Sequence, residues 1–305
     1  MVLYISGEDV EKLLSYDDLI PIIEKCLVNF SKKDDNGIVM PVRSTVDNGN
    51  GYLFTMPCSS KNDEALSVKL VTLFPQQNPS IDSIIVLFNS TTGSIETLID
   101  GKVATHMRTA AASAVALKHL TCLEKCKILC IIGAGAQARS HLNAFRHVCN
   151  FQEVRVWNRT TKNTENFAQE TGAIPFYNAE QAVKNADVVV TATGSQTAVL
   201  CGDWLKPGAF VCSIGAPVET ARELDDAVML QSTVIVDSYA GAGTESGDII
   251  LSKVKMDAEI GEVISGTVSL PQNKFVLFKS LGIAVYDAIT AKHIFLKYKE
   301  REKVN

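Results

Sequence analysis

Apolar residues follow two different patterns along the chain, and the first lies between residues 39 and 99. Apolar and polar residues alternate there in short segments, separated by turn sequences such as Asp-Asn-Gly-Asn-Gly and Thr-Thr-Gly. Alternation with a period of two is typical of strands that bury one face. We therefore predict an antiparallel sheet, accompanied by helices that begin after the N-cap residues Ser6 and Ser15. Its predicted strands are 39–46, 52–56, 65–74, 83–89 and 94–99.

From residue 128 onward, short apolar runs alternate with helical patterns. This alternation predicts a doubly wound parallel sheet, because parallel strands need helical crossovers between them. An Ala-rich helix over 102–120 connects the two regions, and an amphipathic segment over 278–299 is expected to return to the first. The predicted strands are 128–132, 153–157, 174–177, 187–192, 210–214 and 234–237, with helices such as 161–171 and 179–185 between them.

The turn that follows the run 128–132 carries a pattern suited to a dinucleotide. Gly133, Gly135 and Ala138 form G-x-G-x-x-A. The first glycine permits the tight turn, the second leaves room for a pyrophosphate, and the alanine allows close packing of helix on strand. A predicted strand before and a predicted helix after supply the expected context. The alternative is an ordinary strand–turn–helix connection.

The end of the second strand of this region indicates which dinucleotide binds. NAD-binding proteins usually carry Asp or Glu there to hold the ribose hydroxyls. This chain has Asn158, Arg159 and Thr160 instead. A guanidinium and a hydroxyl can bind a 2′-phosphate, so we predict NADPH in preference to NADH. The alternative is that Arg159 is a solvated loop residue.

Composition excludes several classes of function. The 305 residues are 46% hydrophobic and 21% charged, with a formal net charge of -5, which offers no general attraction to nucleic acid or to an anionic membrane. The N-terminal segment lacks the pattern of a signal peptide, and we expect no membrane span. The eight cysteines are scattered without C-x-x-C pairs, so we expect reduced thiols in a cytosolic protein and no zinc site.

Three cations of the first region are candidate substrate ligands. Lys69 shares a strand face with Val71 and Leu73, Arg108 lies on the small-residue face of the Ala-rich helix, and Arg43 opens the predicted hairpin. Buried cations require anions, and a substrate carboxylate would serve. Pattern alone favours structural ion pairs or snorkelling side chains at these positions. Asp248 is interpreted as a helix or loop cap.

Ten segments occur in order over nearly the whole chain: MPVRSTV, GYLFTMP, VKLVTLFP, MRTAAASAVA, IGAGAQARSH, VRVWNRT, RELDD, ESGD, GEVISG and FKSLGIAVYDA. Together they resemble the ornithine cyclodeaminase/mu-crystallin family. WNRT and FKSLG make the resemblance closest to its mu-crystallin branch, the NADPH-dependent ketimine reductases.

The resemblance implies an α/β fold with a Rossmann domain over 119–278. A smaller α+β domain for substrate binding and dimerisation combines 1–118 with 279–305, and a homodimer is expected. In this family the residues matching Arg43, Lys69 and Arg108 line the substrate site, where the arginines hold a carboxylate. The segment 280–282 closes the pocket near the nicotinamide. The predicted cofactor contacts are Gly133, Ala134, Gly135, Ala136, Gln137, Ala138, Asn158, Arg159, Thr160, Ala192, Thr193, Ile214 and Ser280.

Two departures from the family pattern narrow the predicted reaction. Ornithine cyclodeaminases carry an Asp where this chain has Pro217, and a Glu where it has Phe54. Without these carboxylates, which would serve as general base and amine anchor, ornithine cyclodeamination is not expected. We predict NADPH-dependent reduction of cyclic ketimines to cyclic amino acids. The alternatives are an alanine-type dehydrogenase, which needs free ammonia, and a non-catalytic, NADPH-dependent protein that binds thyroid hormone or serves as a lens crystallin.

Overall fold

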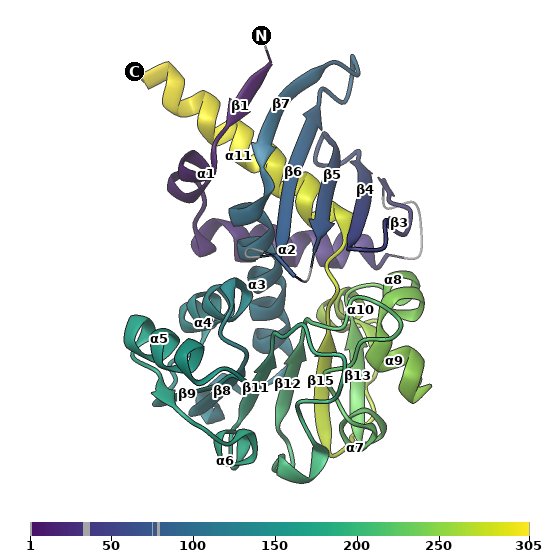
Figure 1. Ribbon diagram of the computed structural model, residues 1–305. Helices are drawn as coiled ribbons and strands as arrows, with labels where there is room; N and C mark the ends of the chain where they lie inside the picture. The colour runs from purple at the N-terminus through teal and green to yellow at the C-terminus, as the bar shows by residue number, and fades with distance from the viewer. Residues whose placement is uncertain (1, 33–36, 75, 78–79, 305) are drawn as a thin grey trace. The chain divides into compact units, whose positions relative to one another are not determined.

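The computed structural model describes residues 2–32, 37–74, 76–77 and 80–304 (Figure 1). The chain divides into two compact units, of which the first is discontinuous: Met1–Thr109 with Gly282–Asn305, and Ala110–Leu281. The sequence prediction separated the domains after residues 118 and 278 instead. The first boundary of the structure therefore falls inside the Ala-rich helix, α3 (Gly101–Leu120), and not at its end.

The first unit contains one sheet with the strand order β1-β7-β6-β5-β4-β2, and β3 pairs with β4. Strands β4 to β7 form an antiparallel meander, whereas β1 pairs with β7 in parallel. The meander follows from the alternating sequence, because every second residue of β4 is buried along most of its length. The bounds are β1 Leu3–Ile5, β2 Ile38–Val39, β3 Ser44–Asp47, β4 Tyr52–Ser60, β5 Ala65–Leu73, β6 Ile81–Phe88 and β7 Ile95–Asp100.

Two features of this sheet differ from the prediction. The single predicted strand 39–46 is divided into β2 and β3, and Pro41 lies between them. Proline has no N–H to donate to a ladder, so it interrupts the pairing with β4. The three-residue strand β1 is too short to show a period and was not predicted.

Among the described residues of the first unit, three helices and part of α3 accompany the sheet. α1 (Gly7–Leu13) and α2 (Tyr16–Phe30) begin as predicted, because Ser6 and Ser15 accept hydrogen bonds from backbone N–H groups of the first turn. α11 (Ala284–Val304) packs against β4, β5 and β6 and against α2. In Figure 1 this yellow helix runs across the sheet, so the last segment of the chain covers one sheet face.

The second unit contains an eight-stranded, entirely parallel sheet with the order β10-β9-β8-β11-β12-β15-β13-β14. Its central strands are buried on both faces, which explains their continuous apolar sequences. The strand order reverses between β8 and β11, the position where doubly wound sheets bind ligands. The bounds are β8 Ile128–Ile132, β9 Glu153–Trp157, β10 Ile174–Pro175, β11 Val188–Thr191, β12 Phe210–Ser213, β13 Ser232–Val236, β14 Ala258–Glu259 and β15 Phe275–Lys279.

Helices lie between these strands and confirm the predicted α/β class. They are α4 Ala136–Val148, α5 Thr161–Thr171, α6 Ala179–Val183, α7 Asp226–Leu230, α8 Tyr239–Glu245, α9 Gly247–Ser252 and α10 Ile260–Ile264, with 3₁₀ turns at Leu123–Lys125 and Gly202–Trp204. Across the described part of the chain, no helix combines the length and apolar character that a bilayer crossing requires.

The start of the predicted amphipathic segment 278–299 was wrong. Phe275–Lys279 forms β15, which lies between β12 and β13, and the helix begins only at Ala284. A short apolar run cannot be assigned to strand or helix from its period alone. Gly282, with φ of +74°, separates the two elements. The strand predicted over 174–177 is also shorter, since β10 ends at Pro175.

Candidate functional site

Lys69 lies in the middle of β5, and its side chain is on the face that α11 covers. Only 2% of the residue is exposed, and Val71 on the same face is also buried, as the alternation predicts. A lysine inside a sheet needs an acidic partner to compensate for its lost hydration. That partner was not among the predicted site residues.

Asp287, on the first turn of α11, is the missing partner. Its carboxylate is fully buried and lies 2.9–3.0 Å from Lys69 Nζ. The same carboxylate accepts hydrogen bonds from Arg108 Nε at 2.9 Å and from Arg108 Nη2 at 3.4 Å. Arg108 is 3% exposed. Two buried cations therefore share one carboxylate, which leaves an excess of positive charge.

Arg43 contributes a third cation to this cluster. Its Nη2 donates to the carbonyl of Gly282 at 3.3 Å, and its guanidinium lies over the ring of Phe54, 5.7 Å from the centroid. Phe54 is buried and occupies the position where ornithine cyclodeaminases are expected to carry Glu. The arginine therefore rests on an apolar ring and not beside a carboxylate at this position.

Gly282 is required at the edge of the cluster by a close contact. Its φ is positive, and a Cβ at this position would lie 2.0 Å from Arg108 Nη1. Within the described residues, that Nη1 is a buried donor without a hydrogen-bond partner. A buried donor left unpaired is costly unless a ligand satisfies it. The arrangement is thus suited to an anion that accepts from Arg108.

Burial and neighbouring charge alter the protonation of this cluster. Burial, followed by the charge of Arg108, lowers the pKa of Lys69 to about 7, although Asp287 acts in the opposite direction. Arg43 lowers the same pKa further. The pKa of His106 is also lowered, chiefly by burial and then by Arg108. Near pH 7, Lys69 is therefore present in both its charged and its neutral form, whereas an exposed lysine is almost entirely charged.

In the second unit, the glycine-rich turn has the geometry that a dinucleotide requires. Gly133 has φ of +115°, and a Cβ there would lie 2.4 Å from the carbonyl oxygen of Ala192. Gly135 is the N-cap of α4, where no side chain caps the helix and a Cβ would meet nothing within 4 Å. The first N–H groups of a 13-residue helix are thus open to phosphate oxygens. Ala138 is fully buried, as expected for close helix–strand packing.

Two further observations fit a nucleotide at this edge. Gln137 Oε1 is a buried acceptor without a partner among the described residues. After β9, Arg159 and Thr160 are exposed, and no side-chain hydrogen bond caps α5 at Thr160. Asn158 donates to the carbonyl of Thr160 and so shapes this turn. These side chains are free to contact an adenosine ribose or its phosphate.

The other predicted cofactor contacts lie at the carboxyl ends of neighbouring strands. Ala192 and Thr193 follow β11, Ile214 follows β12, and Ser280 follows β15. Figure 1 shows β11, β12 and β15 side by side, in agreement with their pairing. Ser280 is buried and donates to Asp237 at 2.7 Å, so its side chain is held inside the unit. The carboxyl edge of the sheet thus brings together the residues assigned to the cofactor.

The sequence matches the ornithine cyclodeaminase/mu-crystallin family over residues 3–302. The chain belongs to this family. It is 41% identical over 302 residues to the ketimine reductase mu-crystallin of Macropus fuliginosus, with 96% of each chain covered.

Solved structures of similar proteins share the architecture of this family member. The Δ1-pyrroline-2-carboxylate reductase of Thermococcus litoralis, solved with NADH and L-proline, has a TM-score of 0.93 and 33% identity, and 99% and 98% of the two chains are covered. An archaeal alanine dehydrogenase dimer with bound NAD has a TM-score of 0.90 and 25% identity, with 99% and 97% covered. Both agree with the fold expected from the family resemblance.

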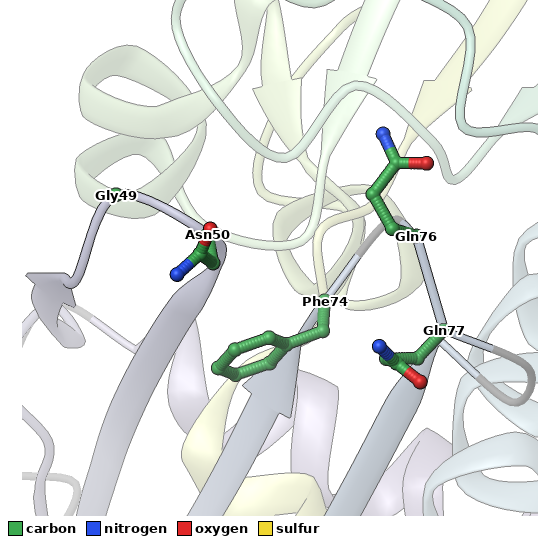
Figure 2. A pocket seen from close by; sticks show the side chains of 5 residues that line it. All are labelled: Gly49, Asn50, Phe74, Gln76 and Gln77. Atoms are coloured by element: carbon green, nitrogen blue, oxygen red, sulfur yellow. The ribbon is translucent and has the colours of Figure 1, made fainter.

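A separate hollow in the first unit is not part of the cationic cluster. It has a volume of about 500 Å³ and is lined by Gly49, Asn50, Phe74, Gln76 and Gln77. Figure 2 shows Phe74 extending from the end of β5 below the turn that carries Gly49 and Asn50. These lining side chains bear no charge, so the hollow offers no counter-ion for a carboxylate. The described residues also contain no group of three or more side chains suited to a metal ion.

The lowered pKa of Lys69 predicts a pH dependence of folding stability. Between about 7 and the ordinary value of 10.5, the unfolded chain binds a proton at Lys69 that the folded protein does not. The free energy of unfolding should therefore rise with pH across this window, and fall as pH decreases toward 7. Lys69→Met should remove this contribution, which denaturant titrations at pH 7 and pH 9.5 can measure.

Lys25→Met is the matched control for this experiment, because Lys25 lies in the same unit and is exposed on α2. Its pH dependence should follow that of the wild type. Equal slopes for the wild type and Lys69→Met would contradict the assignment.

Proposed function

We propose that this member of the family is an oxidoreductase that reduces the C=N bond of cyclic α-imino acids, ketimines, to give cyclic amino acids with NADPH. The observation that carries the proposal is the buried cluster in which Lys69 and Arg108 share Asp287 while Arg108 Nη1 has no partner among the described residues. A carboxylate would satisfy that donor and compensate the excess charge.

Substrate binding follows from the fork geometry of the arginine. Asp287 holds Arg108 through Nε and Nη2, which leaves Nη1 as the donor for a ligand. Gly282 keeps the space beside Nη1 free of a side chain. Arg43 supplies further positive charge and a second donor group for the same carboxylate. The imino acid is thereby oriented by its carboxylate, which leaves its C=N bond to react.

Lys69 supplies the proton in this proposal. With a pKa of about 7, its charged form can donate from Nζ to the imine nitrogen, which makes the imine carbon more electrophilic. The neutral amine then recovers a proton from solvent, and Asp287 keeps Nζ in position throughout. When bound, the nicotinamide supplies the hydride that forms the new C–H bond.

The absence of two family carboxylates supports reduction over cyclodeamination. Phe54 is a buried aromatic residue under Arg43, so no base or amine anchor is available at that position. Pro217 likewise has no side chain that could move a proton. A saturated diamine such as ornithine would therefore lack both its anchor and its base.

Preference for NADPH is supported by the turn after β9. Arg159 is exposed there, and Asn158 replaces the acidic residue that would repel a 2′-phosphate. The Thermococcus litoralis reductase was solved with NADH, so the shared fold by itself does not select NADPH. The guanidinium of Arg159 is therefore the feature on which we base the preference.

Eight free thiols, most of them buried, support the expected cytosolic location.

An alanine-type dehydrogenase is the second candidate, favoured by the similarity to the archaeal alanine dehydrogenase. The same cations could hold the carboxylate of an open-chain imine formed from pyruvate and ammonia. The two reactions differ in their requirement for free ammonia. Thyroid-hormone binding remains a prediction from the resemblance and is an outcome of the experiment below.

We also propose that the exposed sheet face of the first unit joins two copies of the chain. One depression of about 450 Å³ on this face has an apolar part and a polar part. The apolar part is lined by Tyr4, Leu53, Leu70 and Ile84, and the polar part by Thr72, Asp82, Ser83, Asp100 and Lys102. Tyr4, Leu53 and Leu70 are 53%, 38% and 37% exposed. Apolar side chains gathered on an open face favour burial against a partner. The dimeric archaeal neighbour supports a second copy as that partner.

The proposed reaction is tested by following NADPH absorbance with piperideine-2-carboxylate and pyrroline-2-carboxylate. Rapid oxidation is expected with a cyclic ketimine, and little with ornithine or with pyruvate plus ammonia. Arg108→Lys keeps the charge but loses the fork, so kcat/KM should fall about 100-fold while NADPH affinity is retained.

The control for Arg108→Lys is Arg301→Ala, which removes a surface ion pair with Asp9 in the same unit. It should leave turnover unchanged. Normal ketimine reduction by Arg108→Lys would refute the site. Tight iodothyronine binding without turnover on any imine would favour the non-catalytic alternative.

Arg159→Ala tests the choice of cofactor. Loss of one charge-assisted contact should lower the NADPH-to-NADH ratio of kcat/KM by about tenfold or more, with activity on NADH nearly unchanged. Arg146→Ala is the control, because Arg146 is an exposed arginine of the same unit on α4. If Arg159→Ala left the NADPH-to-NADH ratio unchanged, Arg159 would not be the residue that determines the cofactor preference.

Leu70→Asp tests the proposed dimer by sedimentation. The wild type should sediment at twice the chain mass of 33.1 kDa, and Leu70→Asp at the chain mass, because a charge cannot be buried at that interface. Leu296→Asp is the control, since Leu296 is exposed on α11. A wild type that sediments as a monomer would contradict the proposal.

A further inference from the structure

Glu223 joins the carboxyl ends of two neighbouring strands of the second unit. Its side chain is fully buried. Oε1 accepts from the backbone N–H of Thr193 at 2.6 Å and from its hydroxyl at 2.7 Å. Oε2 accepts from the hydroxyls of Thr191 and Ser213 and from the backbone N–H of Gly215, at 2.8, 3.1 and 2.8 Å. One carboxylate thus receives five donors from the ends of β11 and β12.

The backbone around Glu223 is shaped to admit this carboxylate. A Cβ at position 215 would lie 2.4 Å from Glu223 Cδ and 2.4 Å from the carbonyl oxygen of Thr193. Glycine is therefore needed at 215 for the carboxylate to lie between the strand ends. Two of the five donors are backbone N–H groups, which cannot reverse their role and accept a hydrogen bond.

The buried ion pair of Asp248 and Lys279 fixes the segment that carries Glu223. Asp248 Oδ1 accepts from the backbone N–H groups of Glu223 and Leu224 at 2.8 and 2.9 Å, in agreement with its predicted role as a loop cap. Asp248 Oδ2 pairs with Lys279 Nζ at 2.8 Å, and all three charged side chains are fully buried. Lys279 ends β15 and also donates to Ser213 Oγ at 3.0 Å. The network therefore connects the ends of β11, β12 and β15.

The anchored residues coincide in sequence with predicted cofactor contacts. Thr193 is held directly by Glu223. Ile214 lies between Ser213 and Gly215, which are both donors to Glu223. Ser280 follows Lys279 at the end of β15. In doubly wound sheets, ligands bind outside the carboxyl ends of the strands, so the network lies below the surface that a dinucleotide would contact.

We propose that Glu223 is a positioning residue for the nicotinamide half of the cofactor. It acts through Thr193, Gly215 and the segments next to them, and makes no contact with the reacting atoms. The inference rests on the proposed use of a nicotinamide cofactor. A rigid set of strand ends limits the orientations of the nicotinamide ring, whereas the adenosine half is held by the glycine-rich turn and the turn after β9.

Glu223→Gln is the sharpest variant, because it preserves shape but directs an amide NH₂ toward N–H and O–H donors. At least one backbone donor then loses its acceptor, and the strand ends separate. Isothermal titration calorimetry compares the affinity for NADPH with the affinity for 2′-phospho-ADP-ribose, a fragment that lacks the nicotinamide. NADPH affinity should fall about tenfold, and affinity for the fragment should change less than about twofold. NADH and ADP-ribose serve as the equivalent pair for a wild type that prefers NADH.

Asp187→Asn is the matched control. Asp187 accepts from the backbone N–H groups of Lys127 and Ile128 at 2.8 and 2.7 Å, at the amino edge of the same sheet. The other oxygen of Asp187 pairs with Lys206, and the variant directs an amide NH₂ toward that lysine in its place. A carboxylate contact is thus lost away from the proposed cofactor surface, so both ligands should keep their affinity even where the melting temperature falls. Ser213→Ala, which removes one donor to Glu223, provides a milder second variant and should shift NADPH affinity in the same direction.

Equal weakening of NADPH and of the fragment in Glu223→Gln would identify a general structural role and overturn the proposal. Unchanged affinity for both ligands would overturn it as well. A wild type that binds no nicotinamide cofactor would instead refute the proposed function. A wild type that binds NADPH but reduces no ketimine would refute only the reaction, and the titrations would still test the role of Glu223.

Discussion

The buried carboxylate of Asp287 holds the first unit's candidate site together. Without it, Lys69 in the sheet and Arg108 on α3 would be two like charges in the same apolar interior, which is strongly unfavourable. With it, the cations are fixed in separate roles. The pKa of Lys69 lies near neutral pH, and Arg108 keeps one donor available for a ligand. Such a cluster is better explained by ligand binding than by stability, since apolar residues would pack at lower cost.

The second unit uses a buried carboxylate in a different way. Glu223 accepts mainly from hydroxyl and backbone groups, so it joins segments of backbone where Asp287 joins charges. Its own segment is in turn held by the Asp248–Lys279 ion pair. Both carboxylates replace water as the partner of groups that would otherwise be unsatisfied inside the protein. In each unit, the residues of the proposed site are held by a charge that the substrate or cofactor need not touch.

Local patterns were sufficient to predict much of this architecture. The bounds of β8 and β9 agree with those predicted, and the glycines of the G-x-G-x-x-A turn have the expected geometry, because strand period and turn chemistry are local properties. The pairing of Asp287 was not predictable in the same way, since it is 218 residues from Lys69 in sequence. An available signal was an acidic residue on the apolar face of the last helix. β15 was missed because its five residues continue without a clear break into a helical pattern.

The position of Asp287 in sequence has a consequence for how the protein is made. Both cations are synthesised long before their shared carboxylate, and the whole of the second unit is translated in between. The second unit is continuous and can form its sheet from its own residues, whereas the first must wait for α11. During synthesis, β5 therefore carries an unpaired lysine on a sheet face that has no cover. The chain closes its longest loop last, and the cationic site exists only once that loop is closed.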